Sequence, residues 1–424
     1  MDAYLFISGL CIVIILSFFN NILAKKTNIP SVLMLILMGV GIHQLLIYFN
    51  LEPDFTSTLE ILGIIGLIMI VLEAALDLEL KREKWPIIWK SFTIAALSLV
   101  LTSLALAFII LFFIPHIEFL SAIVYALPLS VMSSAIIIPS VTNLDNYKKE
   151  FLIYESTFSD ILGIMVFYMI VENLDAEGMR QLSFAIGSNL VVTIVFSVVL
   201  SYVLLYIIQN IKGQARFFLF LAVLVLLYSI GKMFHLSSLI IILMFGLLLR
   251  NHKVFLFGRL ERWLKDERID AVFKQFQLIT TETSFLVRTF FFVVFGITLP
   301  LMALLNWQVW LISILFLVAT YLLRFGLFYV IEKKDTMPQT FIAPKGLISI
   351  LLFFAIPESL KTSGFESGVF FVVIIATSII MAWSLIATGD KKKRKESDDE
   401  YDESAFKIIR EGSGEQSRYN EAKD

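Results

Sequence analysis

Apolar runs long enough to cross a lipid bilayer follow one another along most of this chain. A transmembrane helix needs roughly 17–25 mostly apolar residues. Runs of that length recur from residue 3 to residue 388, separated by short polar turns or turns that contain Pro or Gly. A continuous apolar run can satisfy its own backbone in the membrane only as a helix, because no water is present there. The sequence therefore predicts an all-α polytopic membrane protein.

Reading the chain for such runs gives about thirteen spans. They are residues 3–23, 30–48, 57–76, 90–114, 118–142, 150–171, 182–210, 216–232, 237–250, 279–304, 308–331, 341–360 and 368–388. The N-terminus lacks the basic segment of a cleaved signal peptide, so the first span is expected to be retained. Together the spans predict one transmembrane domain over residues 1–389.

The composition excludes several classes of function. The chain is 58% hydrophobic and only 17% charged, whereas soluble proteins have about 25% charged residues. No stretch outside the spans is long enough to bury a core of its own, which excludes a nucleic-acid-binding domain and a large catalytic domain. The single cysteine, Cys11, cannot form a disulfide or a Cys-based metal centre within one chain. We therefore expect no enzyme activity and no cofactor.

Lys and Arg residues mark alternate connections between the predicted spans. The odd-numbered connections hold most of them: Lys25, Lys26, Lys81, Arg82, Lys84, Lys148, Lys149, Lys212, Arg216, the basic residues from Arg250 to Lys274, Lys333 and Lys334. The even-numbered connections hold only Arg180, Lys232 and Lys361. Because cytoplasmic loops collect Lys and Arg, this alternation predicts an outside N-terminus and a cytoplasmic C-terminus in a plasma (inner) membrane.

Two segments are too polar to span. Residues 252–277 combine apolar and charged side chains. This pattern predicts an amphipathic connector on the inner membrane surface. Residues 390–424 predict a charged, disordered cytoplasmic tail, whose basic cluster at 391–395 would contact anionic membrane lipid.

Thirteen spans also permit two six-helix halves of inverted orientation, joined by the seventh span. The fifth span of each half is interrupted by polar and helix-breaking residues: Ser133 and Ser134, flanked by Pro128 and Pro139, in one, and Pro344-Lys345-Gly346 in the other. Broken helices at matching positions of inverted repeats point to a binding site at the membrane midplane. The alternative is that these prolines are purely architectural kinks.

Few ionisable residues lie at predicted membrane depth, where each is a functional candidate by default. They are Glu73, Glu155, Asp160, Glu282, Arg288, Arg324 and Lys345. Arg288 and Glu282 lie almost opposite each other around their helix, so we do not expect them to pair. The four histidines, His43, His116, His235 and His252, lie near span ends, which favours interface positions over pH sensing.

Glu155 and Asp160 share the sixth span but point in different directions. Five residues at 100° each place them about 140° apart, whereas Ser156 shares the face of Asp160. We predict that Asp160 exchanges a proton for a cation, because the hydroxyls of Ser156 and Ser159 can ligand Na⁺. Glu155 is expected to form a permanent pair with a buried arginine.

Two further charged residues, Glu73 and Lys345, each allow two interpretations. Glu73 is either a member of the cation and proton site or a carboxylate that reaches the cytoplasmic surface. Lys345 is either a charge-balancing cation opposite the site or an interfacial lysine.

Several motifs resemble the cation/proton antiporter superfamily, in its electroneutral sodium/proton exchanger branch. The segment Glu155-Ser156-Thr157-Phe158-Ser159-Asp160 is similar to that branch's Glu-Ser-x-x-Asn-Asp signature. Further similarities are Leu72-Glu73-Ala74-Ala75-Leu76, Phe290-Phe291-Phe292 with Gly296, Arg324, and Lys345-Gly346-Leu347-Ile348-Ser349. These motifs follow the family's order along the chain.

The resemblance implies a homodimeric exchanger with a rigid dimerisation domain and a moving core. Asp160 would bind cation or proton alternately on either side of the membrane, and Glu155 would pair with Arg324. Ser159 replaces the family's Asn, and Ser133-Ser134-Ala135 replaces its Thr-Asp-Pro. The first broken helix therefore lacks the family's aspartate, and Ser133 and Ser134 join the candidate site in its place. One exchange carboxylate implies one cation per proton.

The expected substrates are H⁺ and a monovalent cation, Na⁺ first and Li⁺ or K⁺ as alternatives, with no resident metal. A K⁺/H⁺ exchanger or K⁺ efflux pathway of the same fold is the nearest alternative. A channel or a membrane sensory protein is more distant, since no Thr-Val-Gly-Tyr-Gly filter segment and no foldable tail domain are present.

Overall fold

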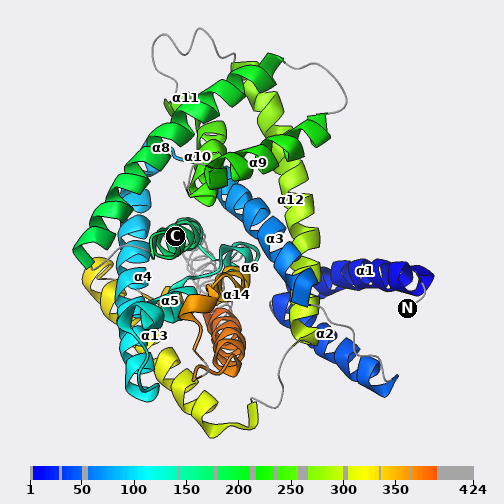
Figure 1. Cartoon of the computed structure of the whole chain (residues 1–424), viewed down its shortest axis with the longest axis vertical. Coiled ribbons are helices and arrows are strands. Elements are labelled where there is room, and N and C mark those ends of the chain that lie inside the picture. The colour runs from blue at the N-terminus through cyan, green and yellow to red at the C-terminus, as the bar shows by residue number, and fades with distance from the viewer. Residues whose placement is uncertain are drawn as a thin grey trace, which may run out of the picture.

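The computed structural model describes eleven stretches of the chain. They are residues 3–27, 31–49, 56–141, 144–174, 179–210, 216–233, 237–255, 266–298, 304–333, 336–362 and 364–388. All the regular elements within these stretches are helices (Figure 1). The predicted all-α class is therefore confirmed.

The helices of the structure follow the predicted spans in order. They are α1 (Ala3–Thr27), α2 (Ser31–Tyr48), α3 (Thr56–Asp77), α4 (Trp85–Phe113), α5 (Phe119–Ser130), α6 (Ser134–Ser140), α7 (Asn146–Val171), α8 (Met179–Asn210), α9 (Arg216–Met233), α10 (Ser238–Arg250), α12 (Asp266–Ile297), α13 (Trp307–Ile331), α14 (Leu347–Phe354) and a last helix, Gly368–Thr388. Short elements are α11 (His252–Phe255) and the 3₁₀ turns η1 (Arg82–Lys84), η3 (Gln339–Phe341) and η4 (Glu358–Leu360).

Three helices begin at least four residues before their predicted apolar runs. α4 begins at Trp85, where a proline in the first turn supplies a favourable start. α7 begins after Asp145, whose side chain accepts a hydrogen bond from the backbone N–H of Lys148. α12 already includes residues 266–277, the second half of the predicted surface connector. Residues 256–265 and the tail at 390–424 lie outside the described part of the chain.

The fifth and twelfth spans are broken, at the positions the sequence indicates. α5 ends at Ser130 and α6 starts at Ser134, with residues 131–133 outside any helix. In the second half, residues 342–346 join η3 to α14 without helical structure. Pro128, Pro139 and Pro344 flank these breaks, and each removes a backbone donor that a continuous helix would need.

The helices pack as two groups. α2 and α3 pack against α12, and α10 packs against α3, α8 and α9; we call α1, α2, α3, α9, α10 and α12 the scaffold group. α4 packs against α5, α7 and α13, and α14 packs against α5; these helices, with α6 and the last helix, are the core group. In Figure 1, α3 and α12 stand across from α4 and α13, with α5, α6 and α14 between them. The groups touch where α7 meets α3 and α10, and where α14 meets α3.

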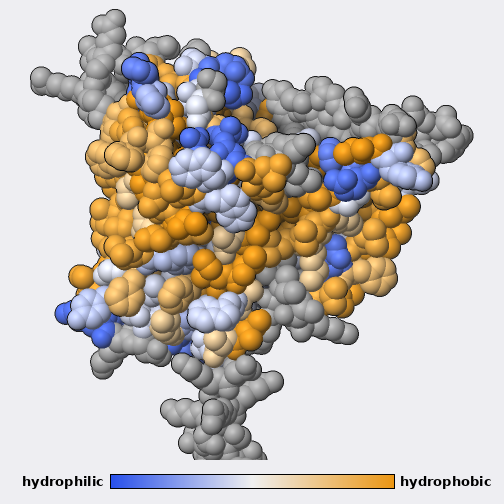
Figure 2. Space-filling model, turned by 90° about the horizontal axis from the view of Figure 1, so that it is seen from below, coloured by the Kyte–Doolittle hydropathy of each residue, from blue (hydrophilic) through white to orange (hydrophobic). Residues whose placement is uncertain are grey.

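The outer surface of the bundle suits a lipid environment. Seven helices in the described part of the chain are long and apolar enough to cross a membrane, and four shorter helices are also apolar. Large apolar side chains are exposed along most of them, and Figure 2 shows hydrophobic residues over most of the face it presents. Because soluble monomers rarely expose apolar patches of this extent, the predicted multi-pass membrane protein is confirmed.

Candidate functional site

Asp160 lies in the middle of α7 and is only 1% exposed. Its Oδ2 accepts a hydrogen bond of 3.0 Å from the backbone N–H of Ser134, the first residue of α6. Its Oδ1 has no hydrogen-bond partner among the described residues. A buried carboxylate normally satisfies both oxygens, so this oxygen is available to a proton or a cation.

The break between α5 and α6 is held against α7 by polar contacts. Ser159 accepts a hydrogen bond of 2.9 Å at Oγ from the backbone N–H of Met132. This contact and the one from Ser134 satisfy donors that the broken helix leaves free. Ser133 donates its backbone N–H to the Pro344 carbonyl at 2.9 Å, which joins the two broken spans at their crossing.

The remaining predicted serine of α7 is turned elsewhere. Ser156 is buried and donates its hydroxyl to the Ile153 carbonyl of its own helix at 3.2 Å. The structure thus brings Ser134 and Ser159 to the junction of Asp160 with the broken helix. The Ser156 hydroxyl is instead bonded to a carbonyl of its own helix.

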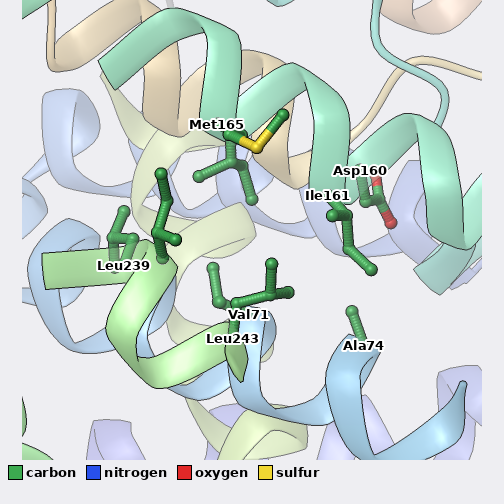
Figure 3. Close-up of a pocket in the computed structure, with 9 residues that line it drawn as sticks. Val71, Ala74, Asp160, Ile161, Met165, Leu239 and Leu243 are labelled. Carbon is green, nitrogen blue, oxygen red and sulfur yellow. The ribbon is translucent and has the colours of Figure 1, made fainter. Parts of the chain in front are cut away.

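A small pocket adjoins Asp160 at the boundary between the two helix groups. In Figure 3, Asp160, Ile161 and Met165 of α7 face Val71 and Ala74 of α3. The far wall is formed by α10, through Leu239, Ile240 and Leu243. Among the described residues of the lining, the carboxylate is the one charged group and the others are apolar, so a cation that enters would find its ligands at Asp160.

Glu155 and Arg324 form an ion pair in the interior of the core group. Arg324 Nη1 lies 2.7 Å from Glu155 Oε1, and Nη2 lies 3.3 Å from Oε2. Glu155 is 0% exposed and Arg324 is 1% exposed. The guanidinium also donates to the carbonyls of Gln339, Thr340 and Ile342, which lie in and beside η3. This fully bonded arginine therefore ties α7 and α13 to the second broken span.

Lys345 lies in the second break and is buried. Its Nζ donates to the Ser130 carbonyl at the end of α5 at 3.0 Å, and its backbone N–H donates to Thr377 of the last helix. The ammonium group thus meets the negative end of the α5 helix dipole. Next to it, Gly346 passes so close to Ser133 that an added Cβ would lie 2.5 Å from the Ser133 Oγ.

Glu73 has a partner that the sequence did not indicate. Arg288 Nη2 of α12 lies 3.1 Å from Glu73 Oε1 and 3.3 Å from Oε2. Both side chains are partly buried in the scaffold group. Glu282, by contrast, is exposed on α12. The contact joins residues 215 positions apart, which no local pattern in the sequence reveals.

Comparisons with known proteins show which family and fold this chain resembles. The sequence model of a family described as "Sodium/hydrogen exchanger, transmembrane" matches residues 12–388. The fold is similar to that of the sodium proton antiporter MjNhaP1 from Methanocaldococcus jannaschii at pH 8, with a TM-score of 0.66 and 20% identity over 92% of this chain and 100% of that chain. An electron-microscopy structure of MjNhaP1 is similar with a TM-score of 0.62, 18% identity, and 92% and 96% coverage. No curated protein sequence matches the chain.

Proposed function

The chain belongs to the sodium/hydrogen exchanger family, and we propose that it carries out cation/proton exchange by alternating access with Asp160 as its single exchange carboxylate. The family is one of transporters, so the prediction that the chain is not an enzyme is confirmed. The observation that carries the mechanism is that Asp160 Oδ1, beside a pocket between the two helix groups, has no hydrogen-bond partner in the described part of the chain.

Coupling follows from competition for this one carboxylate. A charged and empty carboxylate is costly in a water-poor interior. Asp160 is therefore expected to change sides only when a proton or a cation neutralises it. Ser134 and Ser159 lie beside it and hold the broken helix in place. Motion of the core group relative to the scaffold group would open the pocket to either side.

The charge count favours one cation per proton. The neighbour of Asp160 is the neutral Ser159. The sequence left Glu73 as a candidate second carboxylate of the site. In the structure it lies against Arg288 and forms a neutral pair with it. One carboxylate that carries either H⁺ or a monovalent cation moves no net charge in a full cycle. The proposed exchange is therefore electroneutral.

Glu155, Arg324 and Lys345 have supporting roles in this proposal. The Glu155–Arg324 pair holds the crossing of the broken spans in one arrangement through the carbonyls that Arg324 binds. Lys345 places a compensating positive charge at the end of α5. None of these three groups needs to change its charge during transport.

Na⁺ is the proposed cation, and the test separates it from Li⁺ and K⁺. Purified protein in liposomes should move protons when Na⁺ is added, with the same rate under a clamped membrane potential. A response to K⁺ alone would identify a K⁺/H⁺ exchanger of the same fold. Proton flux without any cation, or a rate that follows the clamp, would contradict electroneutral exchange.

The Asp160→Asn substitution tests the carboxylate directly. It removes the charge with little change in shape, so exchange should be lost while the protein remains folded. Asp145→Asn is the matched control, because Asp145 caps α7 at the surface and Asn caps equally well. Full exchange by the Asp160→Asn variant would refute the proposed role.

Topology and assembly complete the proposal. The alternation of Lys and Arg in the connections supports a plasma (inner) membrane protein with its N-terminus outside and its C-terminus inside. Terminal tags digested by protease from one side of sealed vesicles test this orientation. The homodimer implied by the family resemblance is tested by the mass of the purified particle.

A further inference from the structure

A second cavity lies in the same boundary between α7 and the scaffold group, nearer the C-terminal end of α7. Tyr168 and Glu172 form its α7 side, and Tyr228 of α9 closes another side. Ser238 and Leu239 at the start of α10 complete its polar wall and its floor. Unlike the pocket beside Asp160, this cavity has several side-chain oxygens in its lining.

Ser238 is the observation that points to a ligand. It is 1% exposed, and its Oγ has no hydrogen-bond partner among the described residues. Gly231 of α9 makes room for this hydroxyl, because a Cβ there would lie 2.6 Å from the Ser238 Oγ. A buried hydroxyl without a partner is costly, so a bound species that coordinates it would remove this cost.

The charges of the cavity favour a cation. Glu172 directly follows the last residue of α7, so the negative end of a helix of 26 residues lies beside it. Tyr168, Tyr228 and Glu172 line the same cavity, which places the phenols and the carboxylate in one cluster. Carboxylate, hydroxyl and carbonyl oxygens are hard ligands suited to hard cations.

The cavity also adjoins the pocket of Asp160. Asp160, Ile164, Tyr168 and Glu172 follow one another at intervals of four residues, and each interval turns the side chain by about 40°, so Glu172 points about 120° away from Asp160 around α7. At 1.5 Å per residue, Glu172 lies about 18 Å along the helix from Asp160. Leu239 lines both this cavity and the pocket of Asp160, so the two spaces adjoin at one side chain.

From this arrangement we propose that the cavity is a second monovalent-cation site, a vestibule in which Glu172 and Ser238 bind the cation before it passes Leu239 to Asp160. The inference rests on the proposed exchange at Asp160. The alternation of basic connections places the C-terminal end of α7 at the outer face of the membrane. The vestibule therefore serves entry from that face and not from the cytoplasmic face.

Transport kinetics measured separately from each face test the vestibule. In liposomes with the protein in one orientation, Glu172→Gln and Ser238→Ala should each raise the KM for Na⁺ several-fold when Na⁺ is supplied at the C-terminal end of α7. KM from the opposite face and the maximal rate should stay near those of the unchanged protein. Glu118→Gln is the control, since Glu118 is an exposed carboxylate at the start of α5 that does not line the cavity.

Equilibrium binding of Na⁺ tests the site without relying on exchange. The Asp160→Asn variant should still bind Na⁺ weakly by calorimetry, and adding Glu172→Gln should abolish that signal. Normal KM from both faces, or unchanged Na⁺ binding in the double variant, would overturn the vestibule. Equal changes in transport from both faces, together with lower thermal stability, would show that Glu172 and Ser238 have a structural role instead. If the unchanged protein exchanges no cation while the Asp160→Asn variant binds one at Glu172, the proposed function fails, but the cation-binding site at Glu172 and Ser238 remains supported.

Discussion

Glu155 and Asp160 are five residues apart in one helix, and their surroundings differ completely. Both oxygens of Glu155 meet the guanidinium of Arg324, whereas one oxygen of Asp160 is left without a partner among the described residues. Helix geometry alone predicts that the two carboxylates face different sides. Which of them meets an arginine depends on where α13 packs against the core group.

Removal of the Glu155 charge should destabilise the protein strongly. Glu155→Gln leaves the Arg324 charge buried without compensation, and loss of one member of a buried pair costs about 3–5 kcal/mol. Thermal unfolding of the purified protein in detergent should show a clearly lower Tm.

The same substitution at Glu150 is the control for this prediction. Glu150 lies on the same helix and pairs with Lys84 at 2.7 Å, but both side chains are about one-third exposed. Such pairs contribute about 0–1 kcal/mol, so Glu150→Gln should behave like the unchanged protein. Similar Tm values for both variants would contradict the structural role of Glu155.

At the scale of elements, the crossing of the two broken spans depends on small groups in close contact. Gly346→Ala would place a Cβ 2.5 Å from Oγ and 2.7 Å from Cβ of Ser133. The crossing must then widen, so both exchange rate and thermal stability should fall. Adding Ser133→Gly removes both of these contacts, and the double variant should regain stability. A Gly346→Ala variant with unchanged stability would show that the crossing tolerates a side chain.

A second element contact holds the link between the scaffold and core groups. Asn251, at the end of α10, accepts from the Leu80 N–H at 2.6 Å and donates to the carbonyls of Leu78 at 2.8 Å and Leu247 at 3.0 Å. Leu78 and Leu80 lie in the segment that joins α3 to α4. One buried amide therefore attaches α10 to the chain that leaves the scaffold.

Asn251→Ala should leave the Leu80 N–H and the Leu78 carbonyl without this partner, whereas the Leu247 carbonyl keeps the backbone N–H of residue 251. Each unsatisfied buried group costs about 1–3 kcal/mol, so the apparent Tm should fall clearly. Asn173→Ala is the control, because Asn173 makes one hydrogen bond to the Met169 carbonyl in its own helix. Equal Tm values for the two variants would mean that the contact contributes little.

At the scale of the whole molecule, the proposed site lies where two packed groups of helices meet. The pocket of Asp160 takes its walls from α7 on one side and from α3 and α10 on the other. Rigid-body motion of packed groups around a central site is a common route to alternating access. The Glu73–Arg288 pair joins α3 to α12 within the scaffold group, so it is not expected to move with Asp160.

This separation predicts how neutralisation of Glu73 affects transport. Glu73→Gln should lower the exchange rate or stability only moderately, because the pair is partly exposed. Proton flux driven by Na⁺ should remain insensitive to a clamped membrane potential, since Glu73 carries no transported charge. Flux that becomes dependent on the clamp in this variant would make Glu73 part of the exchange site.

The sequence predicted the architecture well because hydropathy acts locally. Each apolar run must become a helix in the membrane, so the spans could be read one at a time, and Pro128, Pro139 and Pro344 marked the breaks. It indicated Asp160 and Glu155 because charges at membrane depth are rare. It did not indicate the Glu73–Arg288 contact, the Asn251 contact or the cavity at Glu172, since each joins helices distant in the chain.

By itself, the amino-acid sequence determined that this protein is a helical membrane protein with two broken spans and very few buried charges. The physical reason is that lipid imposes one local rule on every residue at membrane depth. Only the tertiary structure decided which charges neutralise each other, and it left Asp160 with a free oxygen beside a pocket. Pairing depends on distances between helices, and packing of side chains across the whole bundle sets those distances.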